Sequence, residues 1–243
     1  PSTLGQRLAA IRHAHRLAGV DDPTGHVLVR ETLKGIRRVQ GVKPSRKAPV
    51  TVDRLSAMLA HVDRSTVAGK RDAALLLFGF ASAMRRSELG ALRFEDLELV
   101  PSGLLVTVQR SKSDQEGKGV EIGVPTGRRD ELCPVRAIGE WISAAGIADG
   151  AVFRSVNRHD QAGASITGGA IGQLVKRLAR SAGLKAADFG GHSLRAGFVT
   201  SAAENGANAA AIMEQTRHKS AAMVSIYTRR VDLWKGHAGD GLL

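Results

Sequence analysis

Cysteine and aromatic residues are both scarce in this chain of 243 residues, and each scarcity excludes a class of structure. Cys133 is the only cysteine, so an internal disulfide framework and a cysteine-based zinc site are both excluded. The single thiol fits a reducing compartment. Aromatic residues make up 4% of the chain, which leaves no aromatic platform for stacking single-stranded bases. Apolar residues reach 43%, so we expect a core of aliphatic, alanine-rich helices.

The sequence also has no long apolar segment and no nucleotide-binding motif. Its longest uncharged apolar run, Ala73–Met84, is too short to cross a bilayer and predicts a helix that is buried on all sides. Neither a Walker-type phosphate loop nor a dinucleotide-binding glycine motif occurs in its required context, and no secretory signal is found. Six histidines share no metal-ligand spacing: His13, His15, His26, His61, His159 and His237. We therefore expect a cytoplasmic protein with no cofactor, no metal and no membrane partner.

Positive charge is distributed unevenly along the chain. The formal net charge is +12, and residues 1–50 carry ten Lys and Arg against three Asp and Glu. This excess predicts a polyanionic partner. A solvated charged face is the alternative for the helical part of this segment. The candidate phosphate contacts are Arg30, Lys34, Arg37, Arg38, Lys43, Arg46, Lys47, Arg110, Lys118, Lys176, Arg177 and Arg180.

Two basic helices are predicted before a linker that contains proline and four cations but no acid. The helices cover Ser2–Ala18 and His26–Gln40, where apolar residues repeat at helical spacing beside rows of Arg and Lys. The predicted domains are residues 1–41 as part of a helical domain, residues 42–50 as the linker and residues 51–243 as the main domain. Because the chain begins with proline and enters a helical pattern at once, we expect that an amino-terminal portion has been removed.

The main domain is predicted to be mostly helical with one small antiparallel sheet, an α+β fold. Residues 104–110 and 120–124 alternate apolar and polar side chains around a polar loop, as a β-hairpin does. A short strand is expected at Ala151–Arg154 and a polar loop at Asn157–Ser165. Helices are expected from Thr51 to about His61, over Ser87–Leu92 and over Pro134–Gly146. Two further helices are expected to begin near Lys70 and at Thr167, and three more within residues 192–231.

Tyr227 is the only tyrosine of the chain, and other candidate reactive residues precede it at short intervals. On its own, a single tyrosine more commonly packs against a neighbour with its hydroxyl at the surface. His192 and Arg195 are three residues apart, so on a helix both side chains project from one face and can reach a single phosphate. A surface pair without a ligand is the ordinary alternative. His218 lies 23 residues after Arg195 and nine before Tyr227.

The order and the intervals of these residues resemble the pattern of the tyrosine recombinase family. The carboxy-terminal elements of that pattern are matched by HSLR at residues 192–195, ENGA at residues 204–207, Arg217-His218 and Tyr227. The upstream elements, GLRxSEL and then ALxxxD, are similar to AMRRSEL at residues 83–89 and ALRFED at residues 91–96. The family's hairpin lysine would be Lys112, with Lys118 as the second candidate. The resemblance covers about residues 50–231, and residues 1–40 resemble only the last helices of the family's core-binding domain.

This chain departs from the family pattern at two glycines. Ala83-Met84 stands where the family has Gly-Leu before Arg85, and Thr216-Arg217 stands where it has Leu-Gly before His218. The reactive groups themselves are unchanged. Losing the second glycine removes backbone freedom and can shift His218.

The resemblance implies a site-specific recombinase that cuts and rejoins DNA through a covalent 3′-phosphotyrosyl intermediate and leaves a free 5′-hydroxyl. Two arginines suit this chemistry, because each presents parallel donors to nonbridging phosphate oxygens. The resemblance makes Tyr227 the nucleophile, Arg85 and Arg195 the phosphate clamp, and Glu88 the acid beside the first arginine. Lys112 would be the general acid. His192 would remove the proton from the tyrosine or contact the phosphate, and His218 would donate to a nonbridging oxygen.

The resemblance also implies a nucleoid-associated protein and its partners. The partner would be a double-stranded recombination site, bound by a homotetramer on synapsed DNA whose protomers are monomeric when free. The tail after Tyr227 either passes to a neighbouring protomer or folds back on its own domain. Two other functions are alternatives to recombination: a non-catalytic DNA-binding relative of the family, and a type IB topoisomerase, which shares the reaction but exchanges no strands.

Overall fold

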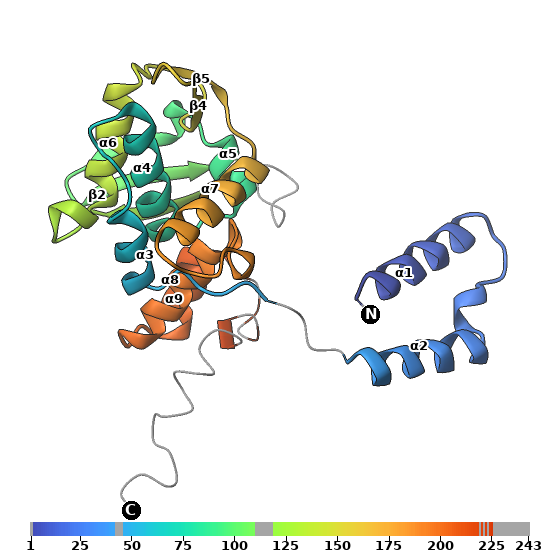
Figure 1. Cartoon of the computed structure of the whole chain (residues 1–243). Coiled ribbons are helices and arrows are strands. Elements are labelled where there is room, and N and C mark those ends of the chain that lie inside the picture. The colour runs from blue at the N-terminus through green and yellow to red at the C-terminus, as the bar shows by residue number, and fades with distance from the viewer. Residues whose placement is uncertain are drawn as a thin grey trace, which may run out of the picture. The chain divides into compact units, whose positions relative to one another are not determined.

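The computed structural model describes residues 2–41, 46–109, 119–218, 220, 222, 224 and 225 of the chain (Figure 1). These residues belong to two compact units, Pro1–Arg46 and Lys47–Leu243. Among the helices of the described ranges, none is both long and apolar enough to cross a membrane.

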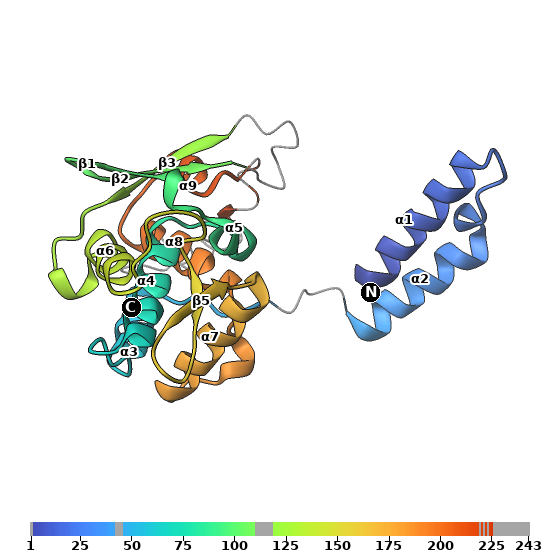
Figure 2. The same cartoon turned by 90° about the horizontal axis from the view of Figure 1, so that it is seen from above.

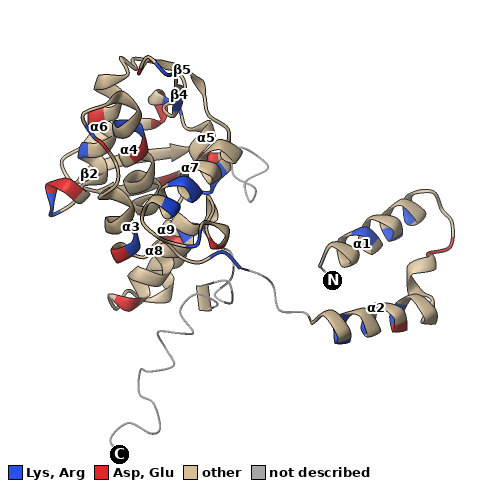
Figure 3. Ribbon diagram, in the orientation of Figure 1, with Lys and Arg blue, Asp and Glu red and all other residues tan. Residues whose placement is uncertain are grey.

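The first unit is a pair of basic helices joined by a capped turn. Helix α1 (Ser2–Leu17) and helix α2 (Val27–Gln40) run alongside one another and are connected through the short 3₁₀ helix η1 (Pro23–Gly25) (Figures 1 and 2). The Asp22 carboxylate accepts the Thr24 backbone N–H at 2.9 Å and Arg12 Nε at 3.0 Å, which fixes the turn. Lys and Arg mark both helices (Figure 3). The apolar stripe predicted on α2 is at most half-buried within this unit.

Seven α-helices of the second unit pack around a main core and a smaller apolar cluster between α8 and α9 in the described part of the chain. Their order is the predicted order, and the fold is mainly α, as the sequence predicted. The third helix expected within residues 192–231 falls mostly on residues outside the described ones. The seven helices are α3 (Val52–Leu59), α4 (Val67–Ala81), α5 (Arg86–Ala91), α6 (Pro134–Ala144), α7 (Gly168–Ser181), α8 (His192–Glu204) and α9 (Ala209–Thr216). Three 3₁₀ turns, η2 (Phe94–Asp96), η3 (Asp130–Leu132) and η4 (Ala186–Asp188), lie between them.

Helix α4 forms the centre of this core. Its residues from Asp72 to Gly79 are all buried, and only Phe80 and Ala81 are half-buried in the apolar run that the sequence singled out. The helix begins where the Asp160 carboxylate accepts the backbone N–H groups of Val67 (2.6 Å) and Ala68 (2.9 Å). Trp141 of the neighbouring α6 is fully buried, and its Nε1 donates to the Val152 carbonyl at 2.9 Å. The start of the central helix is therefore stabilised by a residue that lies far along the chain, Asp160.

A three-stranded antiparallel sheet lies along one side of the helices (Figure 2). Strand β1 (Leu97–Val100) pairs with β2 (Gly103–Val108), which pairs with β3 (Val120–Pro125). The predicted hairpin corresponds to β2 and β3, whereas β1 was not predicted. Gly103 between β1 and β2 has φ 149°, and a Cβ there would lie 2.2 Å from the Val124 carbonyl oxygen, so only glycine fits.

The segment after α6 differs from its prediction. The expected strand at Ala151–Arg154 begins later, as β4 (Arg154–Val156), and the second half of the expected polar loop is strand β5 (Ala162–Ser165). The strands are joined by a turn in which Asn157 Oδ1 accepts the backbone N–H of His159 at 2.8 Å. Prediction of a loop was wrong because Ala162–Ser165 contains only small residues, which carry no strand pattern of their own.

Candidate active site

Arg85 and Glu88 form an ion pair at the start of α5, directly after a left-handed turn. Ala83 in this turn has φ 49°, a conformation that favours glycine. Arg85 is the N-cap of α5 and Glu88 is the third residue of the helix. The Glu88 carboxylate accepts the Arg85 backbone N–H at Oε2 (2.8 Å) and Arg85 Nη1 at Oε1 (2.7 Å). The helix terminus thus places a carboxylate against the first arginine of the motif.

Glu88 is 6% exposed and yet carries its charge. Burial raises the pKa of this carboxyl, but the Arg85 backbone N–H and the guanidinium groups of Arg217 and Arg85 outweigh burial and hold the pKa below its usual range. Glu88 is therefore a fixed negative charge at neutral pH.

Arg195 joins two distant turns through its guanidinium. The residue lies on α8 and is 2% exposed. Its Nη1 donates to the Ala83 carbonyl at 2.7 Å, and its Nη2 donates to the Thr216 carbonyl at the end of α9. Because both carbonyls would lose a buried partner if the side chain moved, the guanidinium is held in place.

His192 begins α8 and lies one helical turn before Arg195. Its side chain reaches solvent, but the protein around the ring disfavours the charged form, and the positive charges of Arg195, Arg85 and Arg86 disfavour it further. Both effects lower the pKa of His192 below 6.5, so the imidazole is neutral at pH 7.

His218 is presented by the turn that ends α9. Arg217 adopts the left-handed conformation (φ 56°, ψ 42°), its N–H donates to the Glu214 carbonyl and the His218 N–H donates to the Met213 carbonyl, each at 3.2 Å. This pair of bonds is a Schellman motif, whose left-handed position usually holds glycine. Arg217 adopts that conformation at a strain of about 1–2 kcal/mol, so the turn is kept although the glycine is lost.

The hydrogen bonds of Thr216 define the tautomer of His218. The Thr216 hydroxyl has one proton, which it donates to the Ile212 carbonyl at 2.6 Å. His218 Nδ1 lies 2.8 Å from the same hydroxyl oxygen. Because that hydroxyl has no second proton, Nδ1 is assigned as the donor and Nε2 as the unprotonated nitrogen. Burial, followed by the charges of Arg195, Arg85, His192 and Arg217, lowers the pKa of His218 to about 4.

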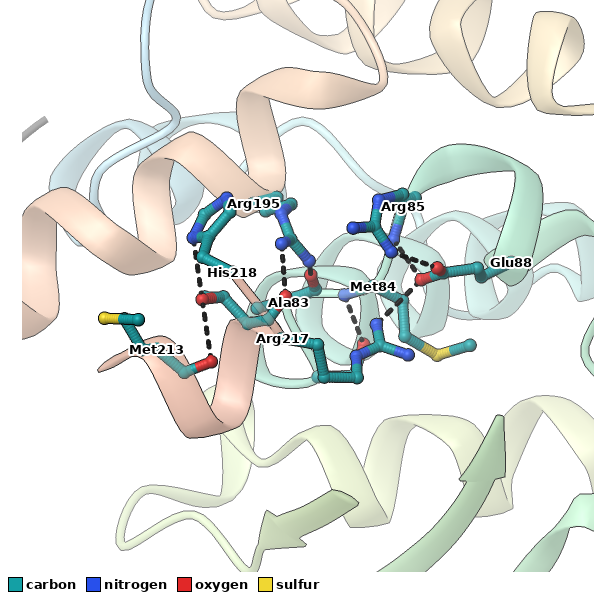
Figure 4. Close-up of polar contacts among 10 residues, drawn as sticks. Ala83, Met84, Arg85, Glu88, Arg195, Met213, Arg217 and His218 are labelled. Carbon is teal, nitrogen blue, oxygen red and sulfur yellow. Dashed lines mark hydrogen bonds and ion pairs between the residues drawn. The ribbon is translucent and has the colours of Figure 1, made fainter. Parts of the chain in front are cut away.

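These groups come together from three separate helices. Arg195 binds the carbonyls of Ala83 and Thr216, which lie two residues before Arg85 and His218 respectively. His192 lies one helical turn before Arg195 on α8. Figure 4 shows Arg85, Arg195 and His218 gathered around the Ala83 turn, with Arg217 on the far side of Glu88 from Arg85. Two guanidinium groups beside two neutral imidazoles can bind a phosphodiester and exchange protons with it.

Known proteins share this sequence pattern and fold. Residues 49–232 match the model of the Phage integrase family, the tyrosine recombinases. The chain belongs to this family. An integrase/recombinase from Selenomonas ruminantium, a XerD homolog, is 36% identical over 241 residues, which are 98% of this chain and 71% of that protein. Tyrosine recombinase XerC of Xanthomonas axonopodis pv. citri is 31% identical over 188 residues, which are 76% of this chain and 56% of that protein.

Solved structures of tyrosine recombinases and integrases share the fold. The Tn1549 transposon integrase, in complex with a circular intermediate DNA, superposes with a TM-score of 0.65 at 16% identity, over 97% of this chain and 79% of that one. The XerH site-specific recombinase, bound to a palindromic difH substrate, gives a TM-score of 0.60 at 19% identity, over 80% of this chain and 54% of that one. This chain thus spans about half of the XerH and XerC chains. The likeness confirms the predicted fold class, a tyrosine recombinase catalytic domain.

The described residues hold five of the seven recombinase site residues that the sequence singled out. Arg85, Glu88, His192, Arg195 and His218 lie in one cluster. Lys112 and Tyr227, together with the candidate DNA contacts Lys43, Arg110 and Lys118, lie outside the described residues.

The remaining candidate DNA contacts lie away from this cluster in the sequence. Those of α2, namely Arg30, Lys34, Arg37 and Arg38, belong to the first unit, and Lys34 pairs with Glu31 at 3.4 Å. Within the second unit, Lys47 Nζ donates to the Ala187 carbonyl at 2.5 Å. Arg177 on α7 is bound to the buried Asp72 carboxylate, which also accepts Arg71 Nη2 at 2.7 Å.

Two residues of the site were missed by sequence reasoning. Thr216 and Arg217 were noted only as replacements of a Leu-Gly pair, yet the first binds His218 and the second binds Glu88. The replacement itself was the available signal, because a non-glycine residue at a glycine position needs a compensating contact.

Proposed function

We propose that this recombinase family member cuts and rejoins DNA strands at a specific site through a covalent 3′-phosphotyrosyl intermediate on Tyr227. The observation that supports the proposal best is the convergence of Arg85 and Arg195 with the neutral His192 and His218. Such a group of fixed donors stabilises the charge that spreads over the phosphate oxygens in the transition state.

The proposed reaction conserves phosphodiester bonds. The Tyr227 oxygen forms a bond to phosphorus while the bond from phosphorus to the 5′-oxygen breaks. The phenolic proton passes to His192, which is neutral at pH 7 and can accept it. Lys112 donates a proton to the departing 5′-oxygen. Because a phenolate leaves more readily than an alkoxide, a 5′-hydroxyl of the partner strand reverses the step without an external energy source.

His218 has a further requirement in this scheme. Its Nε2 is unprotonated in the DNA-free protein, so donation to a nonbridging oxygen requires that the ring take up a proton. The negative phosphate favours that uptake because it offsets the repulsion from Arg195 and Arg85.

The proposed partners are a double-stranded recombination site and further copies of this chain. Residues 1–41 are proposed to be part of a core-binding domain, in which the cations of α2 contact phosphates. We propose a homotetramer on synapsed DNA and a monomer when the protein is free. Duplex affinity is expected to fall steeply with salt, since each phosphate contact releases counterions.

A nicked suicide duplex tests the chemistry. Duplexes that bind the full chain are selected from a genomic pool, nicked beside the protected site and incubated with wild type, Tyr227→Phe and Arg136→Met. Arg136 of α6 pairs with Asp130 and Glu140 and with none of the described residues of the site cluster, so it serves as the matched arginine control. We expect an SDS-stable adduct from wild type and from Arg136→Met, and none from Tyr227→Phe. A wild type without an adduct, or an adduct that survives Tyr227→Phe, contradicts the proposal.

A further inference from the structure

Arg217 reaches from the end of α9 to the carboxylate that holds the first arginine of the site. Its Nη2 lies 2.7 Å from Glu88 Oε2, although the two residues are 129 positions apart in the sequence. The Arg217 side chain is 8% exposed and that of Glu88 is 4% exposed, so water screens the pair weakly. Figure 4 shows Glu88 between Arg85 and Arg217.

The Glu88 carboxylate is shared by two arginines through different oxygens. Oε1 accepts Arg85 Nη1, and Oε2 accepts both the Arg85 backbone N–H and Arg217 Nη2. Arg217 Nε and Nη1 are buried and have no hydrogen-bond partner among the residues that the structure describes. Its strongest contact in this part of the chain is therefore Glu88.

The charges of these three groups explain why the second arginine matters. Arg85 and Glu88 alone sum to zero, so a buried carboxylate would neutralise the cation that must attract the phosphate. With Arg217 present, the three groups sum to +1 and the carboxylate is held from both sides. Arg217 also sets the left-handed corner that presents His218, so one residue connects the α5 half of the site with the α9 half.

We propose that Arg217 is a positioning residue for strand cleavage: it holds Glu88 and offsets its charge, so that Arg85 presents a fixed positive charge to the scissile phosphate. The proposal rests on the function proposed above. The residue acts through Glu88 and Arg85, and the glycine that the family has at this position has no side chain that could act in the same way.

Four variants of the full chain separate this role from a structural one. Arg217→Met removes the charge and keeps much of the side-chain volume, and Arg217→Lys keeps the charge with a single donor group. Glu88→Gln combined with Arg217→Met removes both charges and returns the sum at Arg85 to +1. Arg136→Met is the control. The measurements are the single-turnover rate of adduct formation, duplex affinity at the same salt concentration and thermal unfolding.

We expect Arg217→Met to slow adduct formation on the order of 10²-fold, the effect of a misplaced catalytic group, while duplex affinity changes little. Arg217→Lys should retain an intermediate rate. The double variant should recover part of the rate that Arg217→Met loses, a non-additive result expected of charges in one network. The double variant and Arg217→Lys also keep the proposal testable if Arg217→Met does not fold.

Three results overturn the proposal. The first is a wild-type rate in Arg217→Met. The second is a rate that falls only in step with thermal stability, with no recovery in Arg217→Lys or in the double variant. In the third, wild type itself forms no adduct, and the proposed function fails together with this role. The first two results leave the proposed function intact, so the two failures are distinguishable.

Discussion

Lowering the pH from about 7.5 to about 5 is expected to destabilise the second unit through His218. Burial and the neighbouring charges of Arg195, Arg85, His192 and Arg217 lower the pKa of this imidazole from 6.5 to about 4. The folded protein therefore keeps the ring neutral in this range, whereas the unfolded chain takes up a proton below pH 6.5. Because the unfolded state binds more protons, the free energy of unfolding falls as the pH falls from 6.5 towards 4.

The size of the effect follows from the two pKa values. At pH 5 a full shift between 6.5 and about 4 corresponds to about 2 kcal/mol by proton linkage. The ring is only half-buried, so solvent screening reduces this to about 1 kcal/mol. For a unit of this length, about 1 kcal/mol lowers the melting temperature by about 2–4 °C.

Two other groups of the site titrate nearby, so the measurement needs a variant. The pKa of His192 is lowered by partial burial and by the same arginines, and its contribution has the same sign. The pKa of Glu88 is lowered from 4.5, so the stability that this carboxylate contributes is lost only as the pH falls below about 4.5. Work at pH 5 and above therefore leaves the Glu88 contribution in place.

Urea and thermal unfolding of wild type, His218→Gln and His159→Gln at both pH values test this. His159 lies on an exposed turn and is the matched control. Wild type and His159→Gln should lose about 1 kcal/mol more than His218→Gln between the two pH values. An equal loss in all three proteins, or a wild type that is more stable at pH 5, would refute the assignment of a half-buried, neutral imidazole.

Further substitutions test other contacts of the same structure. Arg195→Lys cannot serve both carbonyls that the guanidinium binds, and we expect calorimetry to show a loss of about 1–3 kcal/mol together with an adduct level near that of Tyr227→Phe. Retained stability in Arg195→Lys would contradict the bridging role. Gly197→Ala would place a Cβ 1.8 Å from the Val50 carbonyl oxygen, so unfolding should become easier by about 1–3 kcal/mol. Its control is Gly139→Ala on α6, where a Cβ meets nothing within 4 Å and a gain of about 0.5–1 kcal/mol is expected.

Helix positions followed from the sequence more reliably than strand positions. The periodic segments around α6 and α7 form helices because their apolar stripes cover a large common core, and the continuously apolar α4 lies inside that core. Strand β1 has four residues, of which Leu99 is 75% exposed, so it lacks the alternation that marks a half-buried strand. Strand β1 forms because it can pair with the free edge of β2, and that edge is present only once the chain has folded.

At the two positions where this chain replaces a glycine of the family pattern, the backbone conformation could not be predicted from the sequence. The pattern marks the positions of Ala83 and Arg217 as glycines, and both have positive φ here. The sequence could not show that the backbone would keep the left-handed conformation without glycine. The contacts at these two residues come from distant parts of the sequence: Arg195 binds the carbonyl of Ala83, and Glu88 binds the side chain of Arg217.

The sequence by itself determined the residue types of the site, their order and the family, because these depend on local spacing and on the chemistry of each side chain. Only the tertiary structure decided which groups touch. Arg217 meets Glu88 across 129 positions, Arg195 meets Ala83 across 112, and Thr216 selects the tautomer of His218 through a hydroxyl with one proton. Contacts over such separations depend on how α5, α8 and α9 pack against the core, and no local pattern encodes that arrangement.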